Sequence, residues 1–229
     1  MNRTYTVETR RSCVVIFGGG TELTNRVVEE FVARGVQAAK VTTLKELETI
    51  KQAYDPDYLV LFLDESTDSW LTGQGSDLYP ILKSLIRSGE SHLTLVRGFG
   101  SDHLRSPLSP IAKQIILSDY VGQGEINSFL LASWLTNIQT TSSLSIPGDG
   151  LGEFSLMGIG DITESLVKAI LYPGTKTGES IVIGNPTPIS YLNLAYLVRT
   201  SLPFKVNLGF DQAVEGDQSS FDSENFEKT

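Results

Sequence analysis

Three consecutive glycines, Gly18 to Gly20, stand between the apolar run CVVIF (13–17) and the amphipathic segment TELTNRVVEEFVARG (21–35). A strand that runs into glycines and then into a helix is how many dinucleotide-binding domains begin. The exposed amides at the start of such a helix attract a phosphate group, because the helix dipole favours negative charge there. The first candidate chemistry is therefore anion binding at this turn. The alternative is a turn capped by Thr21 that binds nothing.

A second group of candidate residues follows the apolar run YLVLFL (58–63). Asp64, Glu65 and Asp68 come soon after this predicted strand, at the end where ligands bind in open α/β sheets. Three carboxylates in this place either hold a hard cation through oxygen ligands or form a solvated acidic loop.

Other chemistries lack their residues. His92 and His103 have no second nitrogen or sulfur ligand near them in the sequence, so we expect no metal such as zinc. The chain also contains no G-x-S-x-G nucleophile elbow and no P-loop.

Hydrophobic periodicity indicates which elements position these residues. The runs 13–17 and 58–63 are continuously apolar, which is typical of strands buried on both faces of a parallel sheet. Between them, apolar residues recur at helical spacing, with Thr21 as the N-cap and Gly35 as the stop. The alternation continues with strands at 36–41 and 92–96 and helices at 43–54 and 77–89. It predicts an α/β fold with a doubly wound parallel sheet.

The rest of the chain continues less regularly. We expect strands at 126–135 and 179–184 and helices at 162–172 and 190–202. The last segment, 210–229, carries six acidic residues and one lysine without an apolar period, as in a mobile acidic tail. The expected organisation is a polar segment at 1–11, one domain at 12–205 and the tail from 206 to 229.

Composition excludes several classes of partner. The 229 residues include 27 acidic and 18 basic ones, a net charge of -9, and no Lys/Arg run exceeds Arg10-Arg11. A nucleic acid therefore has no basic surface to bind. The single cysteine, Cys13, builds no internal disulfide, and no window approaches the roughly 18 apolar residues of a membrane span. We expect a cytoplasmic protein.

The order of several motifs in the second half resembles one family. Gly148-Asp149-Gly150, Phe154, Asp161 and Ile183-Gly184-Asn185 match, in order and spacing, the extended short-chain dehydrogenases, the NAD-dependent epimerase/dehydratase group that acts on nucleotide sugars. With the strand-glycine-helix opening, the resemblance covers residues 12–205. It implies a Rossmann-like domain with a reduced C-terminal substrate part, and NAD or NADP as the cofactor.

The family's catalytic residues can be sought position by position. Its members carry a strand that ends in serines and then a helix with Tyr-x-x-x-Lys, in which the tyrosine is the general acid/base and the lysine lowers its pKa. Here Phe99 falls at the serine position. The segment SPLSPIAKQIILSDYV (106–121) is expected to be the helix, with Ile111 at the tyrosine and Ile115 at the lysine. Isoleucine transfers no proton, and a shifted register brings only Lys113 toward the lysine position.

Two literal Tyr-x-x-x-Lys sequences lie elsewhere. Tyr79 and Lys83 share one face of the predicted helix 77–89, but this helix precedes the strand that leads to Phe99. They are therefore weak substitutes for the catalytic pair. Tyr172 and Lys176 are separated by Pro-Gly, so they are expected in a loop.

The resemblance also implies cofactor positions. If dinucleotide binding survives, the contacts fall on Gly18, Gly19, Gly20, Thr21, Leu23, Lys40 and Leu63. The family's three glycines align with Gly18, Thr21 and Thr24, so a β-branched side chain stands where the pyrophosphate should pass, and Glu22 adds a carboxylate. No acidic residue ends the second strand to hold the ribose hydroxyls. Lys40 either favours a 2′-phosphate or is simply solvated.

Three hypotheses follow. The leading one is a non-catalytic relative that works as a scaffold or partner subunit, as a homo-oligomer or with a related protein, through an apolar helix at 106–121. The second is an active NAD(P)-dependent sugar-nucleotide enzyme with a relocated acid/base such as Tyr79 or Lys113. The third is a sensor that binds a nucleotide without transforming it.

Overall fold

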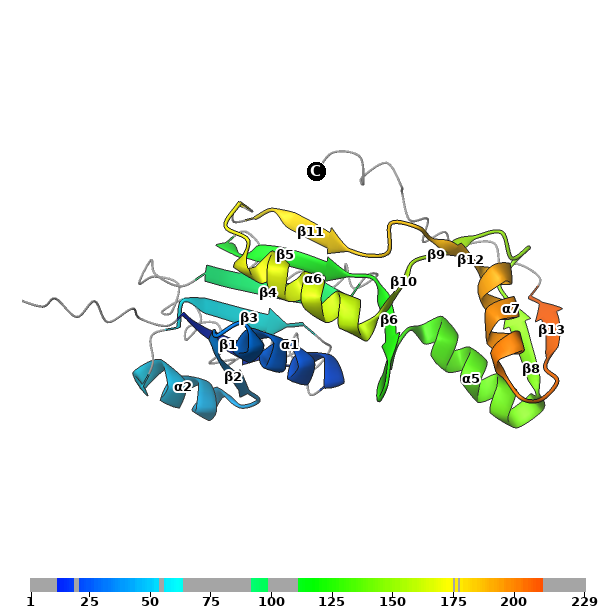
Figure 1. The fold of residues 1–229 in the computed structure, drawn as a ribbon, viewed down its shortest axis with the longest axis horizontal. Coiled ribbons are helices and arrows are strands. Elements are labelled where there is room, and N and C mark those ends of the chain that lie inside the picture. The colour runs from blue at the N-terminus through cyan, green and yellow to red at the C-terminus, as the bar shows by residue number, and fades with distance from the viewer. Residues whose placement is uncertain are drawn as a thin grey trace, which may run out of the picture. The chain divides into compact units, whose positions relative to one another are not determined.

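The computed structural model describes residues 12–18, 21–53, 56–63, 92–98, 111–174, 176 and 178–211. These residues form two compact units. The first takes the described residues up to Arg97 together with 111–116 and 163–181, and the second takes the others. The predicted Rossmann-like α/β class is confirmed by a six-stranded parallel central sheet (Figure 1).

The central sheet has the strand order β11-β5-β4-β3-β1-β2. Its strands are β1 (Cys13–Phe17), β2 (Gln37–Val41), β3 (Tyr58–Phe62), β4 (His92–Gly98), β5 (Lys113–Leu117) and β11 (Ser180–Ile183). β1 pairs in parallel with β2 on one side and with β3 on the other. The chain therefore reverses its direction of travel between β1 and β3, which is the topological switch point of a doubly wound sheet.

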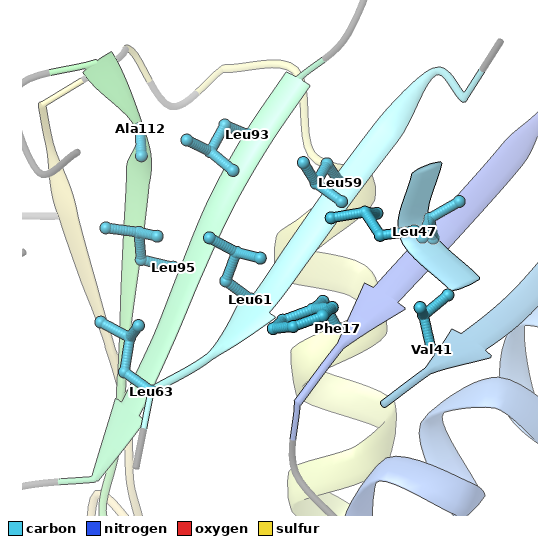
Figure 2. Close-up of a cluster of buried hydrophobic side chains, with 10 residues drawn as sticks. Phe17, Val41, Leu47, Leu59, Leu61, Leu63, Leu93, Leu95 and Ala112 are labelled. Atoms are coloured by element: carbon cyan, nitrogen blue, oxygen red, sulfur yellow. The ribbon is translucent and has the colours of Figure 1, made fainter. Parts of the chain in front are cut away.

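The sheet is buried on both faces, as the apolar runs predict. Val14 to Phe17 of β1 have no exposed surface. On one face, residues of β1, β2, β3 and β4 form a single apolar cluster together with Leu63, Ala112 and Leu47 of α2 (Leu44–Ala53) (Figure 2). On α1 (Glu22–Ala33), Leu23, Val27 and Phe31 are buried at one-turn spacing. Packing of this kind stabilises a parallel sheet because both of its faces are apolar.

Helix ends follow the predicted signals. Thr21 caps α1, and Gly35, with a φ of 77°, follows its C-cap. The helices expected at 162–172 and 190–202 are confirmed as α6 (Ile159–Leu171) and α7 (Tyr191–Ser201). Among the helices within the described residues, none has the length and apolar character needed to cross a bilayer.

The second unit contains three small sheets. β6 (Asp119–Gly122) pairs with β7 (Glu125–Asn127) and with β10 (Leu156–Gly158), β8 (Ser143–Ile146) with β13 (Asn207–Phe210), and β9 (Glu153–Phe154) with β12 (Ile189–Ser190). α5 (Phe129–Thr141) and α7 add to its core, which comprises Leu131, Trp134, Ile138, Leu144, Ile146, Leu194, Ala195 and Val206.

Three sequence predictions are wrong. The segment 106–121 was expected to be a helix. Its described residues, 111–121, instead contain β5 and most of β6, because their apolar side chains belong to strands that pair into the sheets. The strand expected at 126–135 is mostly α5, which Ser128 caps by accepting a hydrogen bond from the Leu131 amide. The tail boundary at 206 is too early, because β13 pairs with β8. The helix expected at 77–89 lies outside the described residues, as does most of 210–229.

The Gly148-Asp149-Gly150 turn joins β8 to the rest of its unit. Gly148 and Gly150 have φ values of 56° and 78°, and the Asp149 carboxylate accepts a hydrogen bond from the Leu151 amide at 2.9 Å. A Cβ at Gly150 would lie 3.0 Å from Ile146 Cγ2. Nothing lies within 4 Å of a Cβ at Gly148. The first glycine is therefore required by backbone conformation alone, and the second also by packing.

This difference gives a matched pair of variants. Gly148→Ala should lower the free energy of unfolding by about 1–2 kcal/mol, the cost of left-handed backbone for alanine. Gly150→Ala should lose about 1–3 kcal/mol more, because its methyl group overpacks the core. Urea unfolding followed by circular dichroism measures both. Equal losses for the two variants would contradict the close packing at Gly150.

Candidate functional site

The carboxyl ends of β1 and β3 flank the switch point of the central sheet, where open α/β sheets bind ligands. Gly18 follows β1 with a φ of 81°, and its amide donates to the carbonyl of Val41 at 3.2 Å. Leu63 follows β3 and is buried, and its amide donates to the carbonyl of Val96 at 2.8 Å. Two of the predicted cofactor positions thus lie at this edge. Gly19 and Gly20 lie outside the described residues.

The start of α1 is closed by threonine side chains. The Thr24 amide donates to Thr21 Oγ1 at 3.4 Å, and the Thr24 hydroxyl donates to the Thr21 carbonyl at 2.8 Å. Thr24 has no exposed surface, so its side chain fills the space between helix and sheet that the family's third glycine leaves open. Leu23 is also buried and packs into the core. The turn keeps its shape but lacks the second and third glycines of a dinucleotide site.

Two charged side chains near this turn already have partners. The Glu22 carboxylate pairs with Arg26 at 3.0 Å along the helix. Lys40 donates to Asn25 Oδ1 at 2.8 Å. Asn25 is neutral, so this contact is a hydrogen bond and not an ion pair.

Glu46 is a residue that the sequence reading missed. Its Oε2 accepts hydrogen bonds from the amides of Thr42 and Thr43 at 2.9 and 3.2 Å, and the Glu46 amide donates to Thr43 Oγ1. These backbone hydrogen bonds lower the pKa of the Glu46 carboxyl. The arrangement is a capping box at the start of α2, which the T-x-x-E pattern signals. The Glu46 carboxylate thus accepts the hydrogen bonds of the two amides directly after β2.

These contacts test whether a dinucleotide fits the switch point. A pyrophosphate needs glycine where it approaches the backbone, and this chain has Thr21 at that position. The amides after β2 are bonded to Glu46. The described residues therefore fit a dinucleotide poorly.

The expected catalytic positions are not on a helix. Ile115 is fully buried in the middle of β5, and Ile111 lies two residues before that strand with 39% of its surface exposed. Their placement at the tyrosine and lysine of a Tyr-x-x-x-Lys helix required helical spacing, so this part of the alignment is wrong. Phe99, Tyr79 and Lys83 lie outside the described residues.

Lys113 begins β5, so it lies at the amino edge of the parallel sheet, opposite to Gly18. Its Nζ donates to the carbonyl oxygens of Ala169, Ile170 and Tyr172 at 3.0, 3.3 and 2.7 Å. Burial lowers the pKa of this lysine. Its three acceptors are at the end of α6, so Lys113 joins a strand to a helix and does not reach the switch point.

The remaining candidate residues are a Tyr-x-x-x-Lys sequence in a loop, a histidine and the acidic residues after β3. Tyr172 follows the last residue of α6, and the Lys176 amide donates to Glu179, as expected for a loop. His92 stacks on Tyr58 with ring centroids 5.4 Å apart. Within the described part of the chain, no group of three or more His, Cys, Asp or Glu residues is placed to hold a metal ion. The acidic residues 64, 65 and 68 lie outside it.

The family-like motif at Ile183-Gly184-Asn185 holds two loops of the second unit together. Ser155 Oγ accepts from the Asn185 amide at 3.0 Å, and a Cβ at Gly184 would lie 3.1 Å from that oxygen. Asp119, after β5, is half-buried, and burial raises the pKa of its carboxyl against an opposing hydrogen bond with Ser128. These polar residues have partners within their own unit.

The role of Lys113 can be tested with a second lysine as control. Lys113→Met should lower the free energy of unfolding by about 1–3 kcal/mol, because three carbonyls lose a charged donor. Lys168 lies on α6 itself and pairs with Glu164 at 2.6 Å on the surface, so Lys168→Met should change the free energy of unfolding little. Chemical denaturation of both variants provides the measurement. Equal losses of stability for the two variants would show that the hydrogen bonds of Lys113 to the end of α6 do not stabilise the fold.

The chain was compared with known proteins. No protein-family model and no curated protein matches the sequence. Among solved structures, GDP-L-fucose synthetase from Naegleria fowleri bound to NADP matches with a TM-score of 0.66 and 11% identity, over 92% of this chain and 84% of that one. The dTDP-glucose 4,6-dehydratase from Bacillus anthracis in complex with NAD matches with a TM-score of 0.63 and 14% identity, over 88% and 85%.

A third match has the same character. UDP-N-acetylglucosamine 4-epimerase from Bacillus cereus matches with a TM-score of 0.60 and 13% identity, over 88% of this chain and 85% of that one. At such low identity the similarity concerns the fold. The chain therefore has the Rossmann-like fold of the extended short-chain dehydrogenases, the NAD-dependent epimerase/dehydratase group.

Proposed function

We propose that this protein is a non-catalytic relative of the nucleotide-sugar epimerases and dehydratases that works as a scaffold or partner subunit. One observation carries the proposal. In the family, the Tyr-x-x-x-Lys helix follows the strand that ends in serines, and β4 leading to Phe99 takes the place of that strand. The connection from β4 to β5, residues 99–112, contains neither tyrosine nor lysine. The element that supplies the family's acid/base therefore lacks both residues.

The switch point supports the same proposal. Thr21 and Thr24 replace two glycines, and Glu46 occupies the amides after β2. Of the proposed substitutes, Lys113 is bonded to three carbonyls at the other edge of the sheet. Tight binding of NAD or NADP is not expected from these contacts.

Exposed apolar side chains support a role in association. Phe129, in the first turn of α5, is 90% exposed, and Ile126 on the adjacent β7 is 39% exposed. Large apolar side chains grouped on a surface mark interaction sites. The surface of Ile126 and Phe129 replaces the segment 106–121 as the proposed contact, because the described residues of that segment, 111–121, contain β5 and most of β6 instead of a helix. We propose a second copy of the chain as the partner.

The catalytic part of the proposal is tested by ligand titration. Thermal-shift measurements with NAD, NADH, NADP, NADPH and UDP-, GDP- and dTDP-sugars should show no dinucleotide binding, and assays with the same compounds should show no turnover. A shift with NAD, NADH, NADP or NADPH but without turnover would make the protein a dinucleotide sensor. Dinucleotide binding with turnover would overturn the proposal, and Tyr79→Phe and Lys83→Met would then locate the relocated acid/base.

The association part has its own test. Light scattering at micromolar concentration should show a dimer of the full chain, and Phe129→Asp should shift it to a monomer because a charge opposes burial of this surface. Val32→Asp is the matched control, since Val32 is 57% exposed on α1 in the other unit and should leave the mass unchanged. A monomeric wild-type chain would contradict self-association.

A further inference from the structure

The second unit contains a cavity of about 310 Å³ between α7, β8 and β13. Every residue that lines it belongs to this unit, so it is independent of the sheet edge at Gly18. Ile146 and Val206, which have no exposed surface and belong to the core, form its apolar floor. The walls above this floor are of a different character.

One wall is a single face of α7. Leu192, Tyr196 and Arg199 all line the cavity, and their spacing of four and then three residues places them in one row along the helix. Tyr196 is 49% exposed. The helix therefore presents an aromatic ring and a guanidinium group, one turn apart, to the same space.

The other wall comes from β13. Leu208 and Phe210 are two residues apart, so they lie on the same face of the strand. Phe210 is 55% exposed, and its Cε1 lies 3.3 Å from the position of a Cβ at Gly150, so the ring lies against the glycine turn. Asn207 adds an amide group to the lining. Two half-exposed aromatic rings, one from α7 and one from β13, thus line the same cavity, and such an aromatic surface suits contact with a planar ring.

Arg199 supplies the charge. It is half-buried, and none of the carboxylates within the described residues pairs with it. Partial burial of a charge without a counter-ion costs free energy, which an anionic ligand would offset. A guanidinium group binds carboxylate or phosphate through two parallel hydrogen bonds. The cavity thus combines an aromatic surface with a site for one anion.

We propose that this cavity binds a small molecule in which a planar aromatic ring carries one anionic group. The ring would lie between Tyr196 and Phe210, and the carboxylate or phosphate would pair with Arg199. The volume is at the lower end of the range for small-molecule sites, ~300 Å³, which favours one ring system with one anionic group.

Isothermal titration of the full chain tests the proposal with probes from both sources of this chemistry. Indole-3-carboxylate and 4-hydroxybenzoate represent aromatic carboxylates, and AMP and UMP represent nucleoside phosphates. At least one probe should bind with a Kd below 1 mM. The matching half-molecules, namely indole, adenosine and inorganic phosphate, should bind at least tenfold more weakly, because each lacks either the anion or the ring. The pair that binds best identifies the source.

Variants locate the binding. Arg199→Gln and Phe210→Ala should each weaken the best probe at least tenfold, while Arg199→Lys should weaken it less because the charge remains. Lys205→Gln is the control, since Lys205 is an exposed cation that does not line the cavity. Circular dichroism melts confirm that each variant is folded. Absence of binding by every probe, equal binding by Arg199→Gln, or equal binding of inorganic phosphate and AMP would overturn the proposal.

Discussion

Burial of the central sheet on both faces is the constraint on which the first unit depends. The strands at its middle have almost no exposed surface, so polar chemistry is confined to their ends. At the carboxyl ends lie Gly18 and Leu63, beside the switch point. At the amino ends, Asp57 accepts a hydrogen bond from the Cys13 amide at 2.7 Å and its carbonyl accepts from His92, so it ties three strands together. The amino edge therefore has a structural role, and the carboxyl edge is the one where open α/β sheets bind ligands.

The same constraint is compatible with the proposed non-catalytic role. A parallel sheet requires that its strands pair and that its faces be covered, but it does not require a particular acid or base. The connection from β4 to β5 can lose tyrosine and lysine while both strands remain paired. In the same way, Thr24 at a glycine position adds a buried side chain to the contact between α1 and the sheet. Changes of this kind leave the strands paired and the faces of the sheet covered.

The second unit depends on close packing around a turn. Gly150 allows Ile146, Leu192 and Phe210 to approach one another, and Trp134 Nε1 donates to the Ser145 carbonyl at 2.6 Å from α5. In the Gly148-Asp149-Gly150 motif, Gly150 is therefore explained by packing and Gly148 by its left-handed backbone. Beside it, Phe210 remains half exposed because β13 lies at the surface. This surface and the neighbouring face of α7 carry the proposed anion site.

The sequence by itself determined the class of the fold and the elements whose signal is local. Hydrophobic periodicity predicts the strands β1 and β3 and the helices α6 and α7. Thr21 and Gly35 also mark the two ends of α1. Tertiary structure decided the segments 106–121 and 126–135. Short apolar runs have no unambiguous period, so pairing into the sheets made a strand of the first, and burial of Leu131, Trp134 and Ile138 against β8 and α7 made a helix of the second. The partners of Lys113 were decided in the same way, because its three acceptors lie more than fifty residues along the chain and reach it only when β5 and α6 pack together.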